Sequence, residues 1–117
     1  PWTIAGTPGN YSALQCKFTI DVSPEAVISI GVTLNGSAEA NGDTLQTWAW
    51  NFNTSLWRKI GSNSSMTTSI ASYSAWTAWG EVYADYIDGD GCMYILANLN
   101  NTNQDLNVDY IELKVAW

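Results

Sequence analysis

The sequence predicts an all-β fold, a single antiparallel β-sandwich of about eight strands with jelly-roll or related Greek-key topology. Apolar and polar residues alternate along most of the chain, which is the period of strands that bury one face. Clusters of Gly, Asn, Ser and Asp interrupt the alternation at short intervals, as turns do between strands. No segment sustains the period of an amphipathic helix. We therefore expect residues 13–117 to form one sandwich domain, preceded by an N-terminal extended arm, residues 1–12.

The first half of the domain supplies two strands and a hairpin. Residues 16–22 alternate strictly, and residues 26–34 repeat the pattern. Residues 35–43 contain Asn-Gly twice, which predicts a loop. Residues 48–52 read as the next strand, and residues 56–60 return as its hairpin partner.

The second half contains both weak and strong signals. Residues 66–70 predict a weak strand, and residues 71–78 have no clear assignment. Residues 79–87 predict another strand. Residues 92–99 are almost entirely apolar, which is typical of a central strand.

The last predicted strand, residues 106–115, contains a change of phase. Its polar residues are Asn107 and Asp109, then Glu112 and Lys114, so the polar positions switch from odd to even. A one-residue slip of this kind is what a β-bulge produces, and we expect it near residues 110–111. The core-facing set is then Leu106, Val108, Ile111, Leu113 and Val115, with Trp117 as a candidate further member.

Two runs of sequence resemble a known class of domain. Residues 48–57, WAWNFNTSLW, and residues 106–115, LNVDYIELKV, resemble stretches of jelly-roll domains of the galactose-binding-like and carbohydrate-binding-module type. Such domains occur in secreted prokaryotic surface proteins and glycoside-processing enzymes. The resemblance implies an extracellular, non-catalytic module, and it transfers no ligand residue.

Charge and composition exclude several functions. The chain has 4 Lys+Arg, 11 Asp+Glu and no His, for a net charge of −7. Nucleic acids and anionic membrane surfaces bind clustered Lys and Arg, so we expect neither as a partner. No apolar run is long enough to span a bilayer. Without His or a Gly-x-Ser-x-Gly motif, the usual nucleophile and base pairs are missing, and we expect that the protein is not an enzyme. The resemblance and the composition lead us to expect a secreted or cell-surface protein.

The two cysteines, Cys16 and Cys92, both lie in predicted strands. They could form a disulfide, or they could be two separate buried thiols, since free Cys is among the most buried residue types. The composition resembles that of extracellular domains, and this favours the disulfide.

A cluster of acidic residues surrounds the predicted turn at residues 88–91. Asp85, Asp88 and Asp90 supply carboxylate oxygens near two glycines, which suits a structural Ca²⁺ ion. The alternative is a plain turn, because Asp-Gly is itself a favoured turn dipeptide. We expect no other cofactor.

Five Asn-x-Ser/Thr motifs are candidate N-glycosylation sites. All fall in predicted loops or in the arm, where Asn, Ser and Thr also gather for conformational reasons. Their asparagines are Asn10, Asn35, Asn53, Asn63 and Asn100.

Aromatic residues are the most informative excess, with 7 Trp, 6 Tyr and 2 Phe. They could be buried after all, because Trp is highly buried on average. Exposed rings otherwise stack on sugars or form protein interfaces.

These features lead to two hypotheses. The first is a non-catalytic structural subunit that assembles with copies of itself into a filament, pilus-like fibre or surface layer. Its interface would comprise Trp2 and Ile4 of the arm and a receiving surface at Tyr73, Trp76 and Trp79. The alternative is a carbohydrate-binding module of a larger secreted enzyme or adhesin, with glycans as partners. Its sugar-stacking residues would be Trp48, Trp50 and Trp57, with the Trp76/Trp79 pair as a further candidate.

Overall fold

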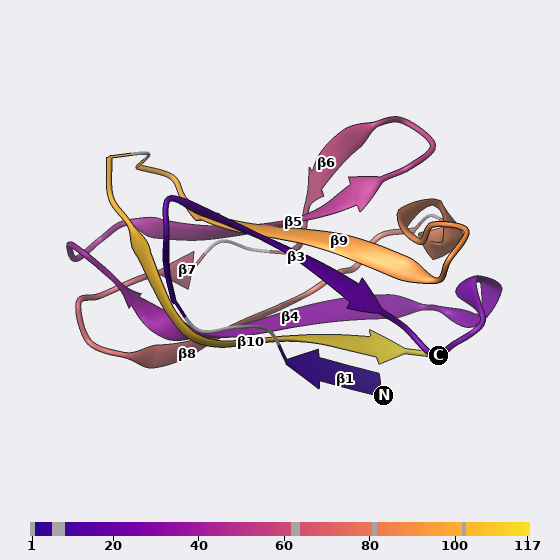
Figure 1. The fold of residues 1–117 in the computed structure, drawn as a ribbon, viewed down its shortest axis with the longest axis horizontal. Helices are drawn as coiled ribbons and strands as arrows, with labels where there is room; N and C mark the ends of the chain where they lie inside the picture. Colours follow the sequence, from indigo (N-terminus) through magenta and orange to yellow (C-terminus); the bar gives the residue numbers. More distant parts are fainter. Residues whose placement is uncertain (1, 6–8, 62–63, 81, 102) are drawn as a thin grey trace.

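Two antiparallel β-sheets pack face to face in the computed structural model of the chain (Figure 1). The structure describes residues 2–5, 9–61, 64–80, 82–101 and 103–117, with side chains from residue 11 onward. The upper layer in Figure 1 contains β3, β9, β5 and β6, and the lower layer contains β4, β10, β8 and β1. The all-β sandwich prediction is confirmed.

The first layer, which we call the β10 sheet, has the order β1-β10-β4-β8, and β2 also pairs with β10. Its strands are β1 (Trp2–Ala5), β2 (Gly9–Tyr11), β4 (Ser29–Ala38), β8 (Ala71–Trp76) and β10 (Leu106–Ala116).

The second layer, the β9 sheet, has the order β3-β9-β5-β6, and β7 also pairs with β5. Its strands are β3 (Ala13–Thr19), β5 (Thr44–Asn51), β6 (Leu56–Lys59), β7 (Ser64–Ser65) and β9 (Cys92–Leu99). Two short 3-10 helices, η1 (Pro24–Ala26) and η2 (Tyr83–Tyr86), lie in the connections. The chain passes from one sheet to the other between β2 and β3, β3 and β4, β4 and β5, β7 and β8, β8 and β9, and β9 and β10, as in jelly-roll and related Greek-key sandwiches.

Strand β10 contributes a full row of side chains to the core. The register of β10 against β4 shifts between Val108 and Tyr110, so the bulged residue is Asp109 and the predicted bulge is confirmed one residue earlier. The five predicted core residues of this strand are each at most 1% exposed. Trp117 is instead 59% exposed, so its assignment to the core is wrong.

The N-terminal segment pairs with its own chain. Strand β1 runs antiparallel to β10, with Trp2 opposite Val115 and Ala5 opposite Glu112, and β2 pairs with the start of β10. Figure 1 shows β1 beside β10, near both chain termini. The described parts of residues 1–12 therefore add to the β10 sheet of their own domain. The side chains of Trp2 and Ile4 lie outside the described residues.

Residues 35–38 belong to β4 instead of the predicted loop, and Gly36 explains why the Asn-Gly pair misleads. A Cβ atom at Gly36 would clash with the backbone carbonyl oxygen of Asn107. The glycine is thus required by a close approach of two strands next to the bulge, and no turn is involved.

Two other strand predictions fail. Residues 66–70 are not a strand; the short strand β7 just before them, Ser64–Ser65, pairs with β5. Among residues 79–87 the described part contains η2 and no strand. Its buried members Tyr83, Tyr86 and Ile87 have helical spacing, so their apolar pattern fits one turn of helix and not a strand. Residues 71–78, which had no assignment, contain β8.

The cysteines are free thiols, so the predicted disulfide is wrong. Cys16 lies on the core side of β3, on the same face as Leu14 and Phe18. Cys92 is opposite Thr19, whereas the residue opposite Cys16 is Ile95. The two cysteines are therefore three residues apart along the paired strands, and Cys92 lies on the outer face of the sheet. This separation is about 10 Å, beyond the roughly 7 Å that a disulfide tolerates between Cα atoms.

No helix in the described part of the chain is long and apolar enough to cross a membrane.

Candidate functional site

Aromatic side chains line the outer face of the β9 sheet. Along β5 the odd-numbered residues from Leu45 to Asn51 are buried in the sandwich, so Trp48 and Trp50 point away from the core. Phe52, just beyond the strand end, has the same parity. Side chains two residues apart on a strand are about 7 Å apart, and the three rings therefore form a row along the strand.

Rings from two neighbouring strands complete this surface. Trp57 of β6 is directly opposite Trp50, and their ring centroids are 5.1 Å apart at an interplanar angle of 66°. On the other side of β5, the ring of Tyr94 in β9 lies 5.7 Å from Phe52 at 64°. Edge-to-face contacts of this kind are a favoured geometry for aromatic pairs, so each ring holds its neighbour in place.

Together these residues enclose a shallow depression, which we call the aromatic hollow. It is lined by Gln15, Trp50, Phe52, Trp57 and Tyr94, and its volume is about 390 Å³. The lining is mostly apolar. Two of its side chains, the Gln15 amide and the Tyr94 hydroxyl, can both donate and accept hydrogen bonds. Volume and composition are those of a small-molecule or oligomer binding site.

Trp48 extends the same face beside the hollow. Its Nε1–H donates a hydrogen bond of 2.9 Å to Oδ1 of Asn98, which fixes the orientation of the indole. The ammonium group of Lys59 lies 5.0 Å from the centroid of the Trp48 ring, and that of Lys17 lies 6.0 Å from the centroid of Tyr94. These are cation–π distances.

The structure brings together the three tryptophans predicted as sugar-stacking residues, Trp48, Trp50 and Trp57. The sequence analysis missed Phe52 as a site residue, although it shares the parity of Trp48 and Trp50. It also missed Gln15 and Tyr94, which come from other strands. No local signal identifies them, because the order of strands in a sheet is not encoded in their alternation.

Residues 4–110 match the family model of the N-terminal glycosyl-hydrolase-114-associated domain. The chain belongs to this family. The domain is also similar to a solved structure described as "CBM4 structure and function", with 14% sequence identity and a TM-score of 0.48, over 97% of this chain and 80% of that chain. No curated protein matches the sequence.

The other aromatic residues predicted for an interface or sugar platform do not gather into one surface of the family domain. Tyr73 is half-buried against the core, whereas Trp76 is 43% exposed on the β10 sheet. Trp79 stacks on Tyr83 at 5.5 Å and 15°, and the guanidinium of Arg58 lies 4.5 Å from its ring centroid. Trp79 is therefore part of a packed cluster around η2.

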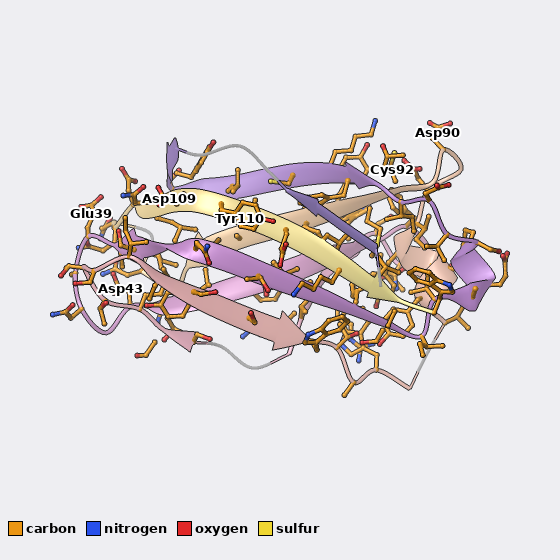
Figure 2. The ribbon with its side chains drawn as sticks, turned by 90° about the horizontal axis from the view of Figure 1, so that it is seen from below. Glu39, Asp43, Asp90, Cys92, Asp109 and Tyr110 are labelled. Atoms are coloured by element: carbon orange, nitrogen blue, oxygen red, sulfur yellow. The ribbon has the colours of Figure 1, made fainter. Side chains whose placement is uncertain are left out.

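One of the acidic residues proposed as calcium ligands, Asp88, stabilises a turn. Oδ1 of Asp88 accepts hydrogen bonds of 2.9 Å from the backbone N–H groups of Asp90 and Cys92, at the end of the domain where Figure 2 labels the latter two residues. Among the residues that the structure describes, no three Asp, Glu or Cys side chains are grouped as metal ligands. The Asp88 hydrogen bonds are those of the plain-turn alternative, whereas Asp85 lies in η2.

The candidate glycosylation sites occupy different environments. Asn53 and Asn100 are exposed, in the β5–β6 turn and after β9. Asn35 lies within β4, half-buried, between Tyr110 and Ser72 of the neighbouring strands, so its predicted loop position is wrong. Asn10 is in β2, with its side chain not described, and Asn63 lies outside the described residues.

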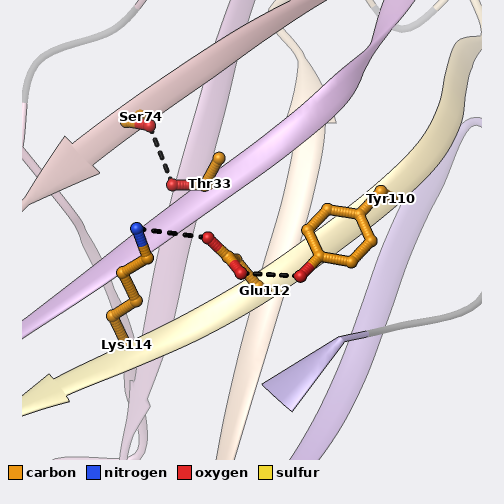
Figure 3. Close-up of polar contacts among 5 residues, drawn as sticks. All are labelled: Thr33, Ser74, Tyr110, Glu112 and Lys114. Carbon is orange, nitrogen blue, oxygen red and sulfur yellow. Dashed lines mark hydrogen bonds and ion pairs between the residues drawn. The ribbon is translucent and has the colours of Figure 1, made fainter. Parts of the chain in front are cut away.

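The outer face of the β10 sheet is polar, in contrast to the aromatic face. The Tyr110 hydroxyl donates a 2.6 Å hydrogen bond to Glu112, whose carboxylate also lies 3.3 Å from the ammonium of Lys114 (Figure 3). Nearby, the hydroxyls of Thr33 and Ser74 are 2.8 Å apart. The Glu112 carboxylate raises the pKa of Tyr110, because it accepts the hydrogen bond that the protonated phenol donates.

Proposed function

We propose that this domain is a non-catalytic carbohydrate-binding module of a larger glycan-degrading enzyme, and that the aromatic hollow is its sugar-binding surface. One observation carries the proposal, namely four aromatic rings and an amide around a hollow of about 390 Å³ on the outer face of one sheet. The family to which the chain belongs is described as associated with a glycosyl hydrolase, which supports a role beside such an enzyme. A glycan-degrading enzyme with this module would act outside the cell.

The chemistry of the hollow matches that of a sugar ring. A pyranose has apolar C–H faces, which pack on aromatic rings, and a rim of hydroxyls, which need donors and acceptors. Trp50, Trp57, Phe52 and Tyr94 supply the ring surfaces, and the amide of Gln15 can both donate and accept hydrogen bonds.

The rings are also held before any ligand arrives. Trp50 and Trp57 contact each other edge to face, as do Phe52 and Tyr94, and all but Phe52 lie on paired strands. A surface ordered in advance loses little side-chain entropy on binding. The row of rings along β5 on an open sheet face suits an internal stretch of polysaccharide better than a chain end.

Self-assembly through the N-terminal arm receives less support. The hypothesis requires that arm to pair with a neighbouring molecule, whereas β1 and β2 pair with β10 of their own chain. We therefore rank the carbohydrate-binding function first.

A polysaccharide panel tests the proposal. Binding of the domain to soluble polysaccharides is measured by calorimetry, and Trp50→Ala is expected to weaken it by about 2 kcal/mol, or about 30-fold. Trp76→Ala is the matched control, because Trp76 is an exposed tryptophan on the opposite sheet. Retention of full affinity by Trp50→Ala, or an equal loss in both variants, would contradict the assignment of the hollow.

A further inference from the structure

The strands that carry the aromatic hollow differ in charge from the rest of the molecule. The five strands of the β9 sheet contain no Asp or Glu, although the chain has 11 acidic residues. The same strands hold Lys17, Arg58 and Lys59, out of 4 basic residues in all. In a protein of net charge −7, the strands of the aromatic sheet thus carry only basic charges, and the nearest acidic residues include Asp85 and Asp88, which are hydrogen-bonded to Phe52 and Cys92 at one end of the sheet.

Two of these basic residues belong to the outer face beside the hollow. Lys17 in β3 is opposite Tyr94, and Lys59 in β6 is opposite Trp48. Because the strand order is β3-β9-β5-β6, the two lysines lie on opposite sides of the row of rings. Three strand spacings separate them across the sheet, which is about 14 Å.

In the described part of the chain, neither lysine forms an ion pair with a carboxylate. Among the described residues, no carboxylate lies within 4.0 Å of the ammonium of Lys17 or Lys59. Lys114 on the opposite sheet is different, since it forms an ion pair of 3.3 Å with Glu112 (Figure 3). The ammonium groups of the two lysines beside the hollow are therefore free of carboxylate partners among the described residues, and a ligand can contact them.

We infer that the ligand of the aromatic hollow is an anionic polysaccharide, one that carries carboxylate or sulfate groups along its chain. The inference rests on the proposed carbohydrate-binding function. The rings contact the sugar faces, while Lys17 and Lys59 contact acidic groups on either side.

Matched pairs of polymers test the inference by calorimetry. Polygalacturonate is compared with its methyl-esterified form, and dextran sulfate with dextran, which distinguishes carboxylate from sulfate as the anionic group. At least one anionic polymer is expected to bind more tightly than its neutral partner and to lose affinity as salt is raised. Lys17→Gln and Lys59→Gln are each expected to lower that affinity by up to about fivefold at low salt, with Lys114→Gln as the unaffected control.

The outcomes separate this inference from the proposed function. If the neutral polymers bind as tightly as the anionic ones and the lysine variants match the wild type, while Trp50→Ala abolishes binding, the anionic preference is overturned and the carbohydrate-binding function stands. If no polymer of either kind binds, both are overturned.

Discussion

Trp57 contacts Trp50 edge to face across strands β5 and β6, with their ring centroids 5.1 Å apart. The two residues are directly opposite in the strand register, so backbone pairing determines the geometry of the contact. Both rings line the aromatic hollow. A binding surface built in this way is as rigid as the sheet that carries it.

Replacement of Trp57 is expected to affect binding more than folding. Trp57→Ala removes the edge-to-face pair, which is worth about 0.5–1.5 kcal/mol beyond area burial, and it also removes one wall of the hollow. We expect glycan affinity to fall by about tenfold or more, while Trp57→Phe keeps part of both effects. Denaturant unfolding of the two variants measures the change in stability, and calorimetry measures the change in glycan affinity. An unchanged affinity for Trp57→Ala would place the ligand elsewhere.

A second prediction concerns the buried hydroxyl of Thr77, which joins η2 to the start of β4. Its Oγ1 accepts a 3.0 Å hydrogen bond from the Ile30 N–H, donates one of 3.2 Å to the Ile30 carbonyl, and lies 2.7 Å from the Tyr83 hydroxyl. Thr77→Val keeps the shape and leaves the Ile30 N–H and the Tyr83 hydroxyl without this partner, whereas the Ile30 carbonyl keeps its bond from the Thr77 backbone N–H. We expect a loss of about 1–3 kcal/mol in the free energy of unfolding, measured by denaturant titration.

Thr33→Val is the control for this experiment. Thr33 also shares a hydrogen bond with a hydroxyl, that of Ser74, but at an exposed position on the β10 sheet (Figure 3). Water can replace that bond, so the free energy of unfolding should change by less than about 0.5 kcal/mol. Equal changes in the free energy of unfolding for Thr33→Val and Thr77→Val would show that burial does not determine how much a lost hydroxyl destabilises the fold.

Much of the sandwich could be predicted because its signals are local. The apolar run of residues 92–99 corresponds residue for residue to strand β9, and the change of phase before Glu112 locates the bulge to within a residue or two. Where local signals have two physical causes, prediction fails. Gly36 looks like a turn residue, but a glycine is needed there because the Asn107 carbonyl leaves no room for a Cβ atom. The aromatic pattern near Tyr83 is that of one helical turn.

The site was predictable only in the part that one hairpin supplies. Trp48, Trp50 and Trp57 follow from the parity of β5 and from the turn that leads to β6. Tyr94 is distant in the sequence and reaches the hollow only because β9 pairs with β5. The disulfide prediction failed for the related reason that Cys16 and Cys92 lie on paired strands but on opposite faces.

The free cysteines lead to a third prediction. Burial raises the pKa of the Cys16 thiol, so little of it is present as reactive thiolate at neutral pH. Cys92 is 4% exposed, so reagents have little access to it. Both thiols should resist alkylation in the native protein and react fully after unfolding, as mass spectrometry would show. Added reductant should leave the thermal midpoint unchanged, and a drop on reduction would reveal a disulfide after all.

The last prediction concerns the pH dependence of Tyr110. The Tyr110 hydroxyl donates to Oε2 of Glu112 at 2.6 Å, and this bond raises the pKa of Tyr110 above its ordinary value of about 10. Because the folded state holds this proton more tightly than the unfolded chain, the resulting stabilisation is complete below the pKa of an unfolded tyrosine. It is lost as the pH rises through the higher pKa of the folded state.

An absorbance titration of phenolate formation measures this shift, and Tyr110→Phe identifies the late-titrating group by removing it. Glu112→Gln removes the negative charge beside the hydroxyl, so the pKa of Tyr110 should fall toward that of an exposed tyrosine. If the titration of Tyr110 were the same in Glu112→Gln as in the wild type, the carboxylate would not be the cause. The aromatic hollow lies on the opposite sheet, so glycan affinity should be equal in the wild type and Glu112→Gln at neutral pH.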